Sequence, residues 1–160
     1  MAQTQQTTRA AAGRPGRVSR WLQHRANART ITRIRRKGGR AMGMDLLILH
    51  TRGRRSGQPR ETPLAWFRDD EGGWLVVASG GGDRDPDWYA NLEAHPDRVA
   101  VELHGAGPVP VRAQRLEGDE RERAWQRIAA AQPRIAKYQR KHERVYPVLR
   151  LTPQRPMETR

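Results

Sequence analysis

At 160 residues and 18.3 kDa the chain has room for one domain with a buried core, and its net charge of +14 suggests an anionic partner without specifying a fold. The absence of cysteine excludes disulfides, thiolate nucleophiles and cysteine-bearing metal sites. Residues 1–44 hold 11 of the 31 basic residues and none of the 17 acidic ones, so residues 45–160, with 20 basic and 17 acidic residues, carry only +3.

The N-terminal quarter of the chain divides into two parts. Residues 1–16 are rich in Gln, Thr, Ala, Gly and Pro, and we expect a flexible tail. Residues 17–43 form a basic segment of helical character, with Val18, Trp21 and Leu22 on one side. Ile31 and Ile34 fall on a different face at 100° per residue, which predicts two short helices or a broken one.

From residue 45 the apolar pattern acquires the two-residue period of strands. Five strands are expected at 45–51, 61–68, 73–79, 98–104 and 109–116, and a closing strand within 145–151. A short crossing helix is expected in "DPDWYANLEAHP", capped by Asp85 with Pro86 at its first position. Helices beginning near Asp119 and at Pro133 complete an α+β, mainly β domain over 44–152, followed by a tail at 153–160.

The loop in "HTRGRRSGQPRETPLAW", residues 50–66, has an unusual composition for a turn. Turns are normally built from Gly, Asn, Asp or Ser, because these residues ease the backbone conformation or bond to it, and arginine does neither. Arg52, Arg54, Arg55 and Arg60 therefore suggest a bound anion. A solvated basic hairpin is the alternative, because arginine supplies 28 of the 31 basic residues throughout the chain.

Other familiar chemistries lack their motifs. The five histidines show no metal-ligand spacing, so no metal site is predicted, and neither a dinucleotide fingerprint nor a phosphate-binding P-loop occurs. Four tryptophans, Trp66, Trp74, Trp88 and Trp125, are most simply core residues. Tyrosine hydroxyls at 89, 138 and 146 can be either satisfied core groups or donors to a substrate.

Three segments in order carry a resemblance: "TRGRRSGQPRETPL", "VVASGGG" and "DPDWYANLEAHP". Over Met44–Leu151 the chain resembles the deazaflavin-dependent nitroreductase family. These are split β-barrel oxidoreductases, of the flavin-reductase and pyridoxamine-phosphate-oxidase-like architecture, that use the deazaflavin coenzyme F420. The resemblance implies hydride transfer from reduced F420 to an electrophilic acceptor such as a quinone, enone or nitroaromatic, which would be a small, planar or apolar molecule.

The resemblance also assigns a set of cofactor-binding residues. The loop would hold the phosphate and glutamate tail of F420, and the following strands and short helix would hold its ring. The implied set is Arg54, Arg55, Ser56 and Arg60, then Thr62, Pro63 and Leu64, then Val77, Ala78, Ser79 and Gly80, and finally Trp88, Tyr89 and Asn91.

The chain departs from the family pattern at three positions. Gly80 stands where members of the family place a lysine, and Gln132 and Ile135 stand where studied relatives have tyrosines on the substrate side. Tyr138 is retained and is the candidate catalytic proton donor.

Several alternatives remain open at the level of sequence. A non-catalytic carrier of the deazaflavin, a flavin mononucleotide enzyme of related fold and a basic nucleic-acid-binding protein are rivals, the last being the least favoured. The chain shows no apolar leader and no run that could span a bilayer, so a cytoplasmic location is expected. The basic segment 17–43 also suggests peripheral attachment to an anionic membrane surface, or an arm that is merely solvated or covers the barrel mouth.

Overall fold

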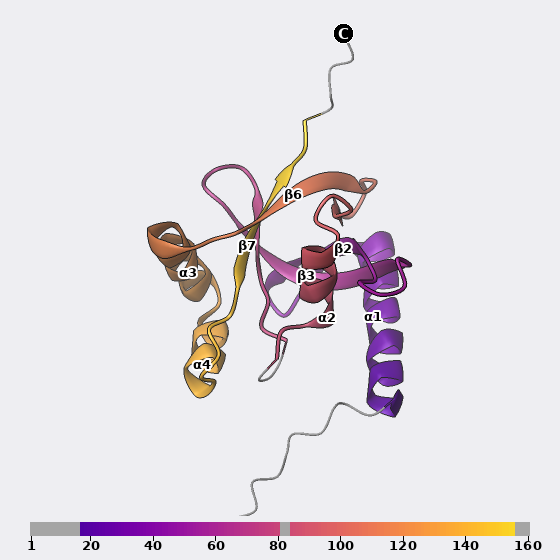
Figure 1. The fold of residues 1–160 in the computed structure, drawn as a ribbon, viewed down its shortest axis with the longest axis horizontal. Coiled ribbons are helices and arrows are strands. Elements are labelled where there is room, and N and C mark those ends of the chain that lie inside the picture. Colours follow the sequence, from indigo (N-terminus) through magenta and orange to yellow (C-terminus); the bar gives the residue numbers. More distant parts are fainter. Residues whose placement is uncertain (1–16, 81–83, 156–160) are drawn as a thin grey trace, which may run out of the picture.

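A computed structural model describes residues 17–80 and 84–155, which form a closed antiparallel barrel (Figure 1). Its strands are β2 (Met44–Arg52), β3 (Pro59–Arg68), β4 (Trp74–Val77), β5 (Ala100–Glu102), β6 (Val109–Arg115) and β7 (Val148–Pro153). Their order is β2-β3-β4-β7-β6-β5, β2 pairs again with β5, and a two-residue β1 (Arg40–Ala41) flanks β2. The predicted split β-barrel of an α+β, mainly β chain is confirmed.

Strand β2 closes the barrel because it has two partners. It pairs with β3 along its length, from Asp45 with Trp66 to Arg52 with Pro59. It also pairs with β5, where Ile48 lies opposite Glu102. Leu47 and Leu49 point into the barrel while Ile48 packs against an outer helix, so both faces are buried. This double burial accounts for the unbroken apolar run in β2.

The interior of the barrel is filled by the strands and one helix. Helix α2 (Asp87–Ala94) inserts Trp88, Tyr89 and Leu92 among the inward side chains. The predicted Asp85 cap is wrong: the helix begins at Asp87, Pro86 is the N-cap residue and no side chain caps it. The Asp85 carboxylate instead pairs with Arg144 at 2.6 Å, a contact that local sequence cannot reveal.

Two groups of helices cover the outside of the barrel (Figure 1). Helix α1 (Arg17–Lys37) lies on one side, where Ile31 and Ile34 pack on Ile48. On the other side, α3 (Gly118–Ala131) and α4 (Pro133–Lys141) cover a second core that includes Leu75 and Ile128.

The prediction that α1 is broken or divided is wrong, because α1 is one continuous helix. Its two apolar faces lie at opposite ends of the helix. The C-terminal half packs on the barrel, whereas Val18, Trp21 and Leu22 are 71%, 55% and 56% exposed. Gly38, with φ 105°, ends the helix and donates its N–H to Ile34 O.

The predicted domain boundaries remain a prediction. The barrel strands run from Met44 to Pro153, close to the expected 44–152, and α1 occupies most of the expected segment 17–43. The predicted tail at 1–16 and the end of the C-terminal tail lie outside the described residues. Within the part of the chain that is described, no helix combines the length and the apolarity needed to cross a bilayer.

An ionic network fastens α1 to three strands. The Arg35 guanidinium contacts Glu61 Oε1 on β3 at 2.7 Å and Glu102 Oε1 on β5 at 2.8 Å. His50 Nε2 on β2 lies 2.7 Å from Glu102 Oε2. Hydrogen bonds from Arg35 lower the pKa of Glu102 from its ordinary 4.5 to about 2, although burial opposes the shift. The same contacts raise the pKa of Arg35. The network therefore requires the Glu102 carboxylate to be ionised.

Replacing Glu102 by Gln should remove this requirement. Because the folded-state pKa is depressed, the contribution of Glu102 to stability is complete above pH 4.5 and is lost as pH falls toward about 2. We expect Glu102→Gln to lower the free energy of unfolding by about 1–3 kcal/mol at pH 7 and to flatten its decline over that acid range. Denaturant titrations at several pH values measure both effects. Glu143→Gln, at an exposed carboxylate, is the control, and parallel acid declines of wild type and Glu102→Gln would refute the assignment.

Candidate cofactor-binding site

The arginine-rich loop between β2 and β3 is a compact turn. The Gly57 N–H donates to Gly53 O at 2.8 Å, and the Gly53 N–H donates to Gln58 O at the same distance. Gly57 has φ 67°, in the left-handed region that favours glycine. Ser56 Oγ accepts the Gln58 N–H at 3.2 Å, so its hydroxyl already shapes the turn. The backbone of the turn is thus shaped by its glycines and Ser56, and Arg52 adds a long hydrogen bond to Gly57 O at 3.5 Å.

Asn91 of α2 anchors this loop to the barrel. The Arg54 backbone N–H donates to Asn91 Oδ1 at 2.9 Å. Asn91 is only 7% exposed, so its amide is a buried polar group with a long-range partner. The Arg54 guanidinium lies farther out, 3.4 Å from the exposed Asp87 carboxylate. The structure therefore brings two predicted site residues, Arg54 and Asn91, into contact, with Asn91 bonded to the loop backbone. Their contact with the cofactor stays a prediction.

The remaining loop arginines carry uncompensated charge. The Arg55 and Arg60 side chains are exposed, and neither side chain forms an ion pair or hydrogen bond within the described part of the chain. Arg55 belongs to the loop, whereas Arg60 lies at the start of β3 and pairs there with Thr51. Among the residues that the structure describes, Arg55 and Arg60 have no acidic partner, and Arg54 has only the exposed Asp87. Three such guanidinium groups suit a ligand that carries several negative groups. The donor set on this loop fits the phosphate and glutamate tail of a deazaflavin coenzyme.

The predicted ring-binding residues lie on two strands. Thr62, Pro63 and Leu64 are half-buried on β3. Val77 ends β4 and is followed by buried Ala78, half-buried Ser79 and exposed Gly80. This end of β4 leads toward α2, whose Asn91 holds the arginine loop.

Gly80, where the resemblance implies a lysine, has a backbone conformation that favours glycine. Its φ is 62°, and a Cβ atom there would lie 2.5 Å from Arg84 O. Any larger residue would have to displace that carbonyl, so the local backbone requires glycine. A lysine, as the resemblance implies for this position, would not fit this backbone without a shift.

Trp88 and Tyr89 lie mainly in the core. They are 7% and 2% exposed, and their rings meet edge to face at 6.1 Å. The Tyr89 hydroxyl accepts a hydrogen bond from Arg115 at 3.3 Å, and burial raises the pKa of Tyr89, so this phenol is protonated at neutral pH. Their direct contact with a cofactor stays a prediction, because both rings expose little surface.

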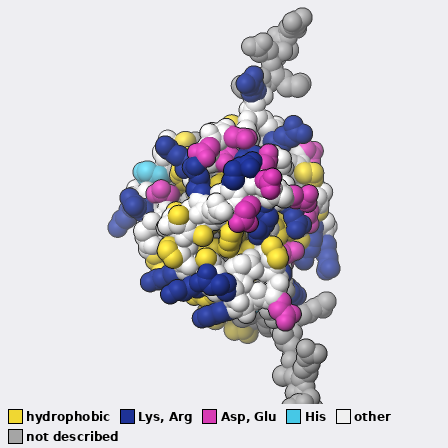
Figure 2. All heavy atoms as spheres, turned by 90° about the vertical axis from the view of Figure 1, so that its left-hand side faces the viewer, with side chains coloured by type: hydrophobic (Ala, Val, Ile, Leu, Met, Phe, Trp, Pro, Cys, Tyr) yellow, Lys and Arg dark blue, Asp and Glu magenta, His cyan; other side chains and the backbone are white. Residues whose placement is uncertain are grey.

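Tyr138 lies on α4, away from the arginine loop. It is 58% exposed and lines a hollow of about 310 Å³ with Arg134, Lys137 and Lys141. Figure 2 shows this side of the molecule, where basic side chains gather beside apolar ones in the lower part and acidic ones concentrate above. Ile135 packs against the second core instead of lining the hollow.

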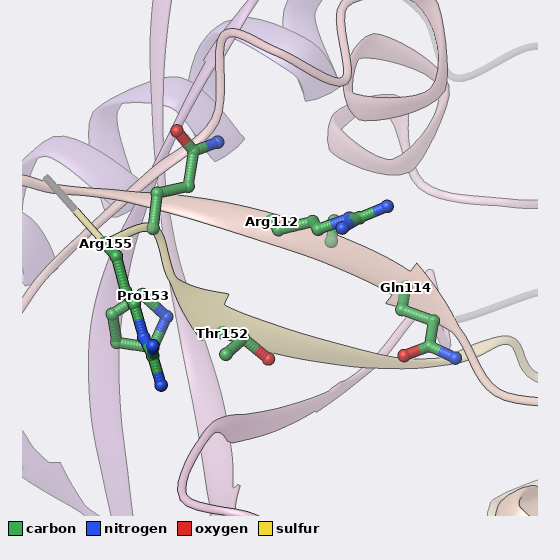
Figure 3. Close-up of a pocket in the computed structure, with 7 residues that line it drawn as sticks. Arg112, Gln114, Thr152, Pro153 and Arg155 are labelled. Carbon is green, nitrogen blue, oxygen red and sulfur yellow. The ribbon is translucent and has the colours of Figure 1, made fainter. Parts of the chain in front are cut away.

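A larger hollow of about 910 Å³ lies on the outer surface of β6 and β7 (Figure 3). Its lining is Arg112, Ala113, Gln114, Thr152, Pro153, Gln154 and Arg155. None of these is a predicted site residue. Size alone therefore does not locate the cofactor, and the convergence of cationic and polar groups near α2 is the better guide.

The ionic network also contains a set of potential metal ligands that sequence spacing did not reveal. Atoms of His50, Glu61 and Glu102 lie within 4.8 Å of one another. The Arg35 guanidinium already bonds to both carboxylates, so the positive charge that a metal would bring is already present. The absence of a metal stays a prediction, and Arg35 supports it.

Sequence reasoning missed Arg144. Its Nη2 donates to Ser79 O at 2.5 Å, and its Nη1 pairs with Asp85 at 2.6 Å. These partners lie 65 and 59 residues away, so no local pattern could have identified them.

A closed split barrel whose cationic loop is anchored by Asn91 of a helix that packs against the barrel core suits a protein that binds an anionic cofactor. Residues 21–153 match the family described as F420H(2)-dependent quinone reductase, and the chain belongs to that family. It is an F420-dependent oxidoreductase, and its cofactor is coenzyme F420. The recognition from sequence is confirmed at this level.

Similar proteins support the same assignment. The F420H(2)-dependent quinone reductase Rv1261c of Mycobacterium tuberculosis is 39% identical over 111 residues, which cover 66% of this chain and 72% of that protein. A solved F420-H2 dependent reductase, FDR-A, is 37% identical with a TM-score of 0.58, over 66% of this chain and 92% of its own. A chain described as a domain-swapped dimer is 32% identical with a TM-score of 0.60, over 84% and 98%.

Removing the Asn91 amide should loosen the arginine loop. Asn91→Ala leaves the Arg54 N–H without its acceptor, and we expect a loss of about 1–2 kcal/mol in stability and faster amide exchange at 53–57. Hydrogen exchange read by mass spectrometry measures the second effect. Asn91→Asp keeps an acceptor oxygen at this position and is the matched control. Equal loop exchange in wild type and Asn91→Ala would show that this bond does not hold the loop.

Proposed function

We propose that this protein transfers a hydride from reduced F420 to a flat, apolar electrophile, with a quinone as the first candidate and enones and nitroaromatics as the wider class. The observation that carries the proposal is a pair of uncompensated arginine side chains, Arg55 on the loop anchored to α2 and Arg60 at the start of β3. Membership of the F420H(2)-dependent quinone reductase family supports the choice of acceptor.

Binding and orientation are the tasks of this chain. Bound F420 supplies the hydride from its C5 position. Arg54, Arg55 and Arg60 would bind the anionic tail through paired guanidinium donors. The backbone of Val77–Gly80 and the half-buried face of Thr62–Leu64 would hold the ring, while the core around Trp88 keeps water from the barrel side. No dedicated base is required of the protein, which agrees with the absence of a catalytic triad.

Two rival functions predict different observations. A carrier without turnover would bind F420 and leave a quinone unreduced by the bound, reduced coenzyme. A nucleic-acid-binding protein would show affinity for duplex DNA that falls steeply with salt. We favour the oxidoreductase because residues 45–160, which contain the barrel, carry only +3.

The uncompensated loop arginines give the proposal its main test. Replacing Arg55 and Arg60 together by Ala should raise the Kd for F420 by roughly a hundredfold or more, because charge-assisted bonds contribute about 1.5–3 kcal/mol each. Thermal stability should change little, since both side chains are exposed. Fluorescence titration measures the Kd. The double variant Arg29→Ala/Arg123→Ala removes two exposed charges elsewhere and is the control, and unchanged F420 affinity in the loop variant would eliminate the clamp.

Tyr138 is proposed to donate the proton that accompanies hydride transfer. Tyr138→Phe should lower kcat for a quinone or enone by roughly a hundredfold or more, the usual range for general acid catalysis, and leave the Kd for F420 unchanged. Stopped-flow oxidation of reduced F420 measures this. Because Tyr138 is exposed on α4, the variant should fold normally. Equal turnover would leave solvent water as the proton source.

The exposed half of α1 is proposed to attach weakly to an anionic membrane surface. Val18, Trp21 and Leu22 are exposed, Arg25 lies 4.8 Å over the Trp21 ring, and no acid occurs in the helix. Near an anionic leaflet each Lys or Arg contributes about 1 kcal/mol, and tryptophan favours the headgroup region. Attachment would bring the site to a lipid-soluble acceptor.

Vesicle co-sedimentation tests this attachment. Wild type should bind phosphatidylglycerol vesicles at low salt and phosphatidylcholine vesicles poorly. The triple variant Val18→Ser/Trp21→Ser/Leu22→Ser should bind at least several-fold less. Met42→Ser/Val145→Ser, which removes two other exposed apolar side chains, is the control. Wild type that stays in the supernatant under all conditions would contradict membrane attachment.

A further inference from the structure

Arg144 joins the C-terminal helices to the connection that follows β4. It lies three residues beyond α4, and its guanidinium contacts Ala78, Ser79 and Asp85 among the described residues of the β4–α2 connection. Nη2 donates to Ser79 O at 2.5 Å, and both terminal nitrogens lie within 3.4 Å of Ala78 O. Nη1 also pairs with Asp85 at 2.6 Å. One side chain thus bonds both to the residues that follow β4 and to Asp85, which precedes α2.

The position of Arg144 is itself fixed by its neighbours. Gln139 Nε2 donates to Arg144 O at 2.6 Å, and Gln139 Oε1 accepts the Tyr146 N–H at 2.7 Å. The guanidinium lies 5.0 Å from the ring centroid of Tyr146, which is 1% exposed. Because these contacts hold the backbone of the segment and place the guanidinium against a buried ring, Arg144 is already ordered by the protein's own contacts.

The bonds to Ala78 and Ser79 affect the amides that follow. Each carbonyl shares a peptide group with the next N–H, so a cationic donor on the oxygen polarises that group and strengthens the N–H as a donor. The N–H groups concerned belong to Ser79 and Gly80, and neither has an acceptor in the part of the chain that is described. Two polarised donors therefore lie at the end of β4.

We propose that Arg144 is a positioning residue for the cofactor, holding the Ala78–Gly80 backbone and its two N–H donors in the geometry that receives the deazaflavin ring. The inference rests on the proposed function. The C-terminal helices would then serve two purposes. Helix α4 carries Tyr138, the proposed proton donor, and the segment after it carries Arg144, which holds the backbone proposed to bind the cofactor. Asp85, predicted as a helix cap, serves here as the acidic partner that keeps the guanidinium in place.

Four variants in the full chain test this role. Arg144→Ala removes the bonds to Ala78, Ser79 and Asp85, and Arg144→Lys keeps the charge without the planar guanidinium. Asp85→Asn removes the acidic partner, and Arg140→Ala removes an exposed arginine of α4 as the control. Measurements are hydrogen exchange in the cofactor-free protein, the Kd for F420, and kcat and KM with reduced F420 and a quinone.

We expect faster exchange at 77–80 and 84–86 in Arg144→Ala, and a Kd for F420 raised by roughly tenfold. The KM for reduced F420 should rise while kcat at saturation changes by less than about twofold, because the residue acts on binding. Arg144→Lys should lie between Arg144→Ala and wild type, Asp85→Asn should shift in the same direction to a smaller extent, and Arg140→Ala should match wild type.

The failures of the two proposals are distinguishable. Wild type that does not bind F420 would overturn the proposed function and this role with it. Wild type that binds, together with a folded Arg144→Ala variant of unchanged Kd, would overturn the positioning role alone, even if local exchange increased. Should Arg144→Ala fail to fold, Arg144→Lys and Asp85→Asn decide, and wild-type Kd in both would refute the inference.

Discussion

The double pairing of β2 is the constraint on which the rest of the structure depends. Because β2 bonds to β3 along one edge and to β5 along the other, the sheet closes and leaves one apolar interior. Closure places His50, Glu61 and Glu102 on adjacent strands, and these groups receive Arg35 from α1. It also fixes where β2 ends, and hence where the arginine loop begins. Helix α2 packs Trp88, Tyr89 and Leu92 into the core, and its buried Asn91 accepts a hydrogen bond from the Arg54 N–H of that loop.

The site follows from this arrangement through contacts between distant segments. The loop of 53–58 is held by α2, and the end of β4 is held by Arg144. In both places a distant side chain bonds to the backbone, Asn91 to the Arg54 N–H and Arg144 to Ser79 O. The guanidinium groups of Arg55 and Arg60 are therefore not used in these contacts. The side chains of Arg55 and Arg60 have no ion-pair or hydrogen-bond partner within the described residues. We propose that they bind the anionic tail of the deazaflavin coenzyme that the family uses.

Local sequence predicted the elements well and their long-range partners poorly. The period of the strands, the turn residues and the restart at Pro133 located the barrel and the C-terminal helices. The continuity of α1 was missed because Ile31 and Ile34 face the barrel whereas Trp21 faces outward, and a single helix can serve both. Asp85 looked like a cap because nothing near it indicates Arg144, and His50 showed no ligand spacing because Glu102 approaches it only through strand pairing. The arginine loop was recognisable because its composition has no explanation in turn chemistry.

The central claim is that the arginine loop and the end of β4 make a site for F420, and equilibrium titration of the wild-type protein with F420 and with flavin mononucleotide tests it most directly. The two ligands differ in their tails, so the added anionic groups of F420 probe the uncompensated arginines. We predict binding of F420 at least roughly a hundredfold tighter, corresponding to about two charge-assisted bonds, with the difference shrinking at high salt. Equal or tighter binding of flavin mononucleotide would contradict the assignment of this site.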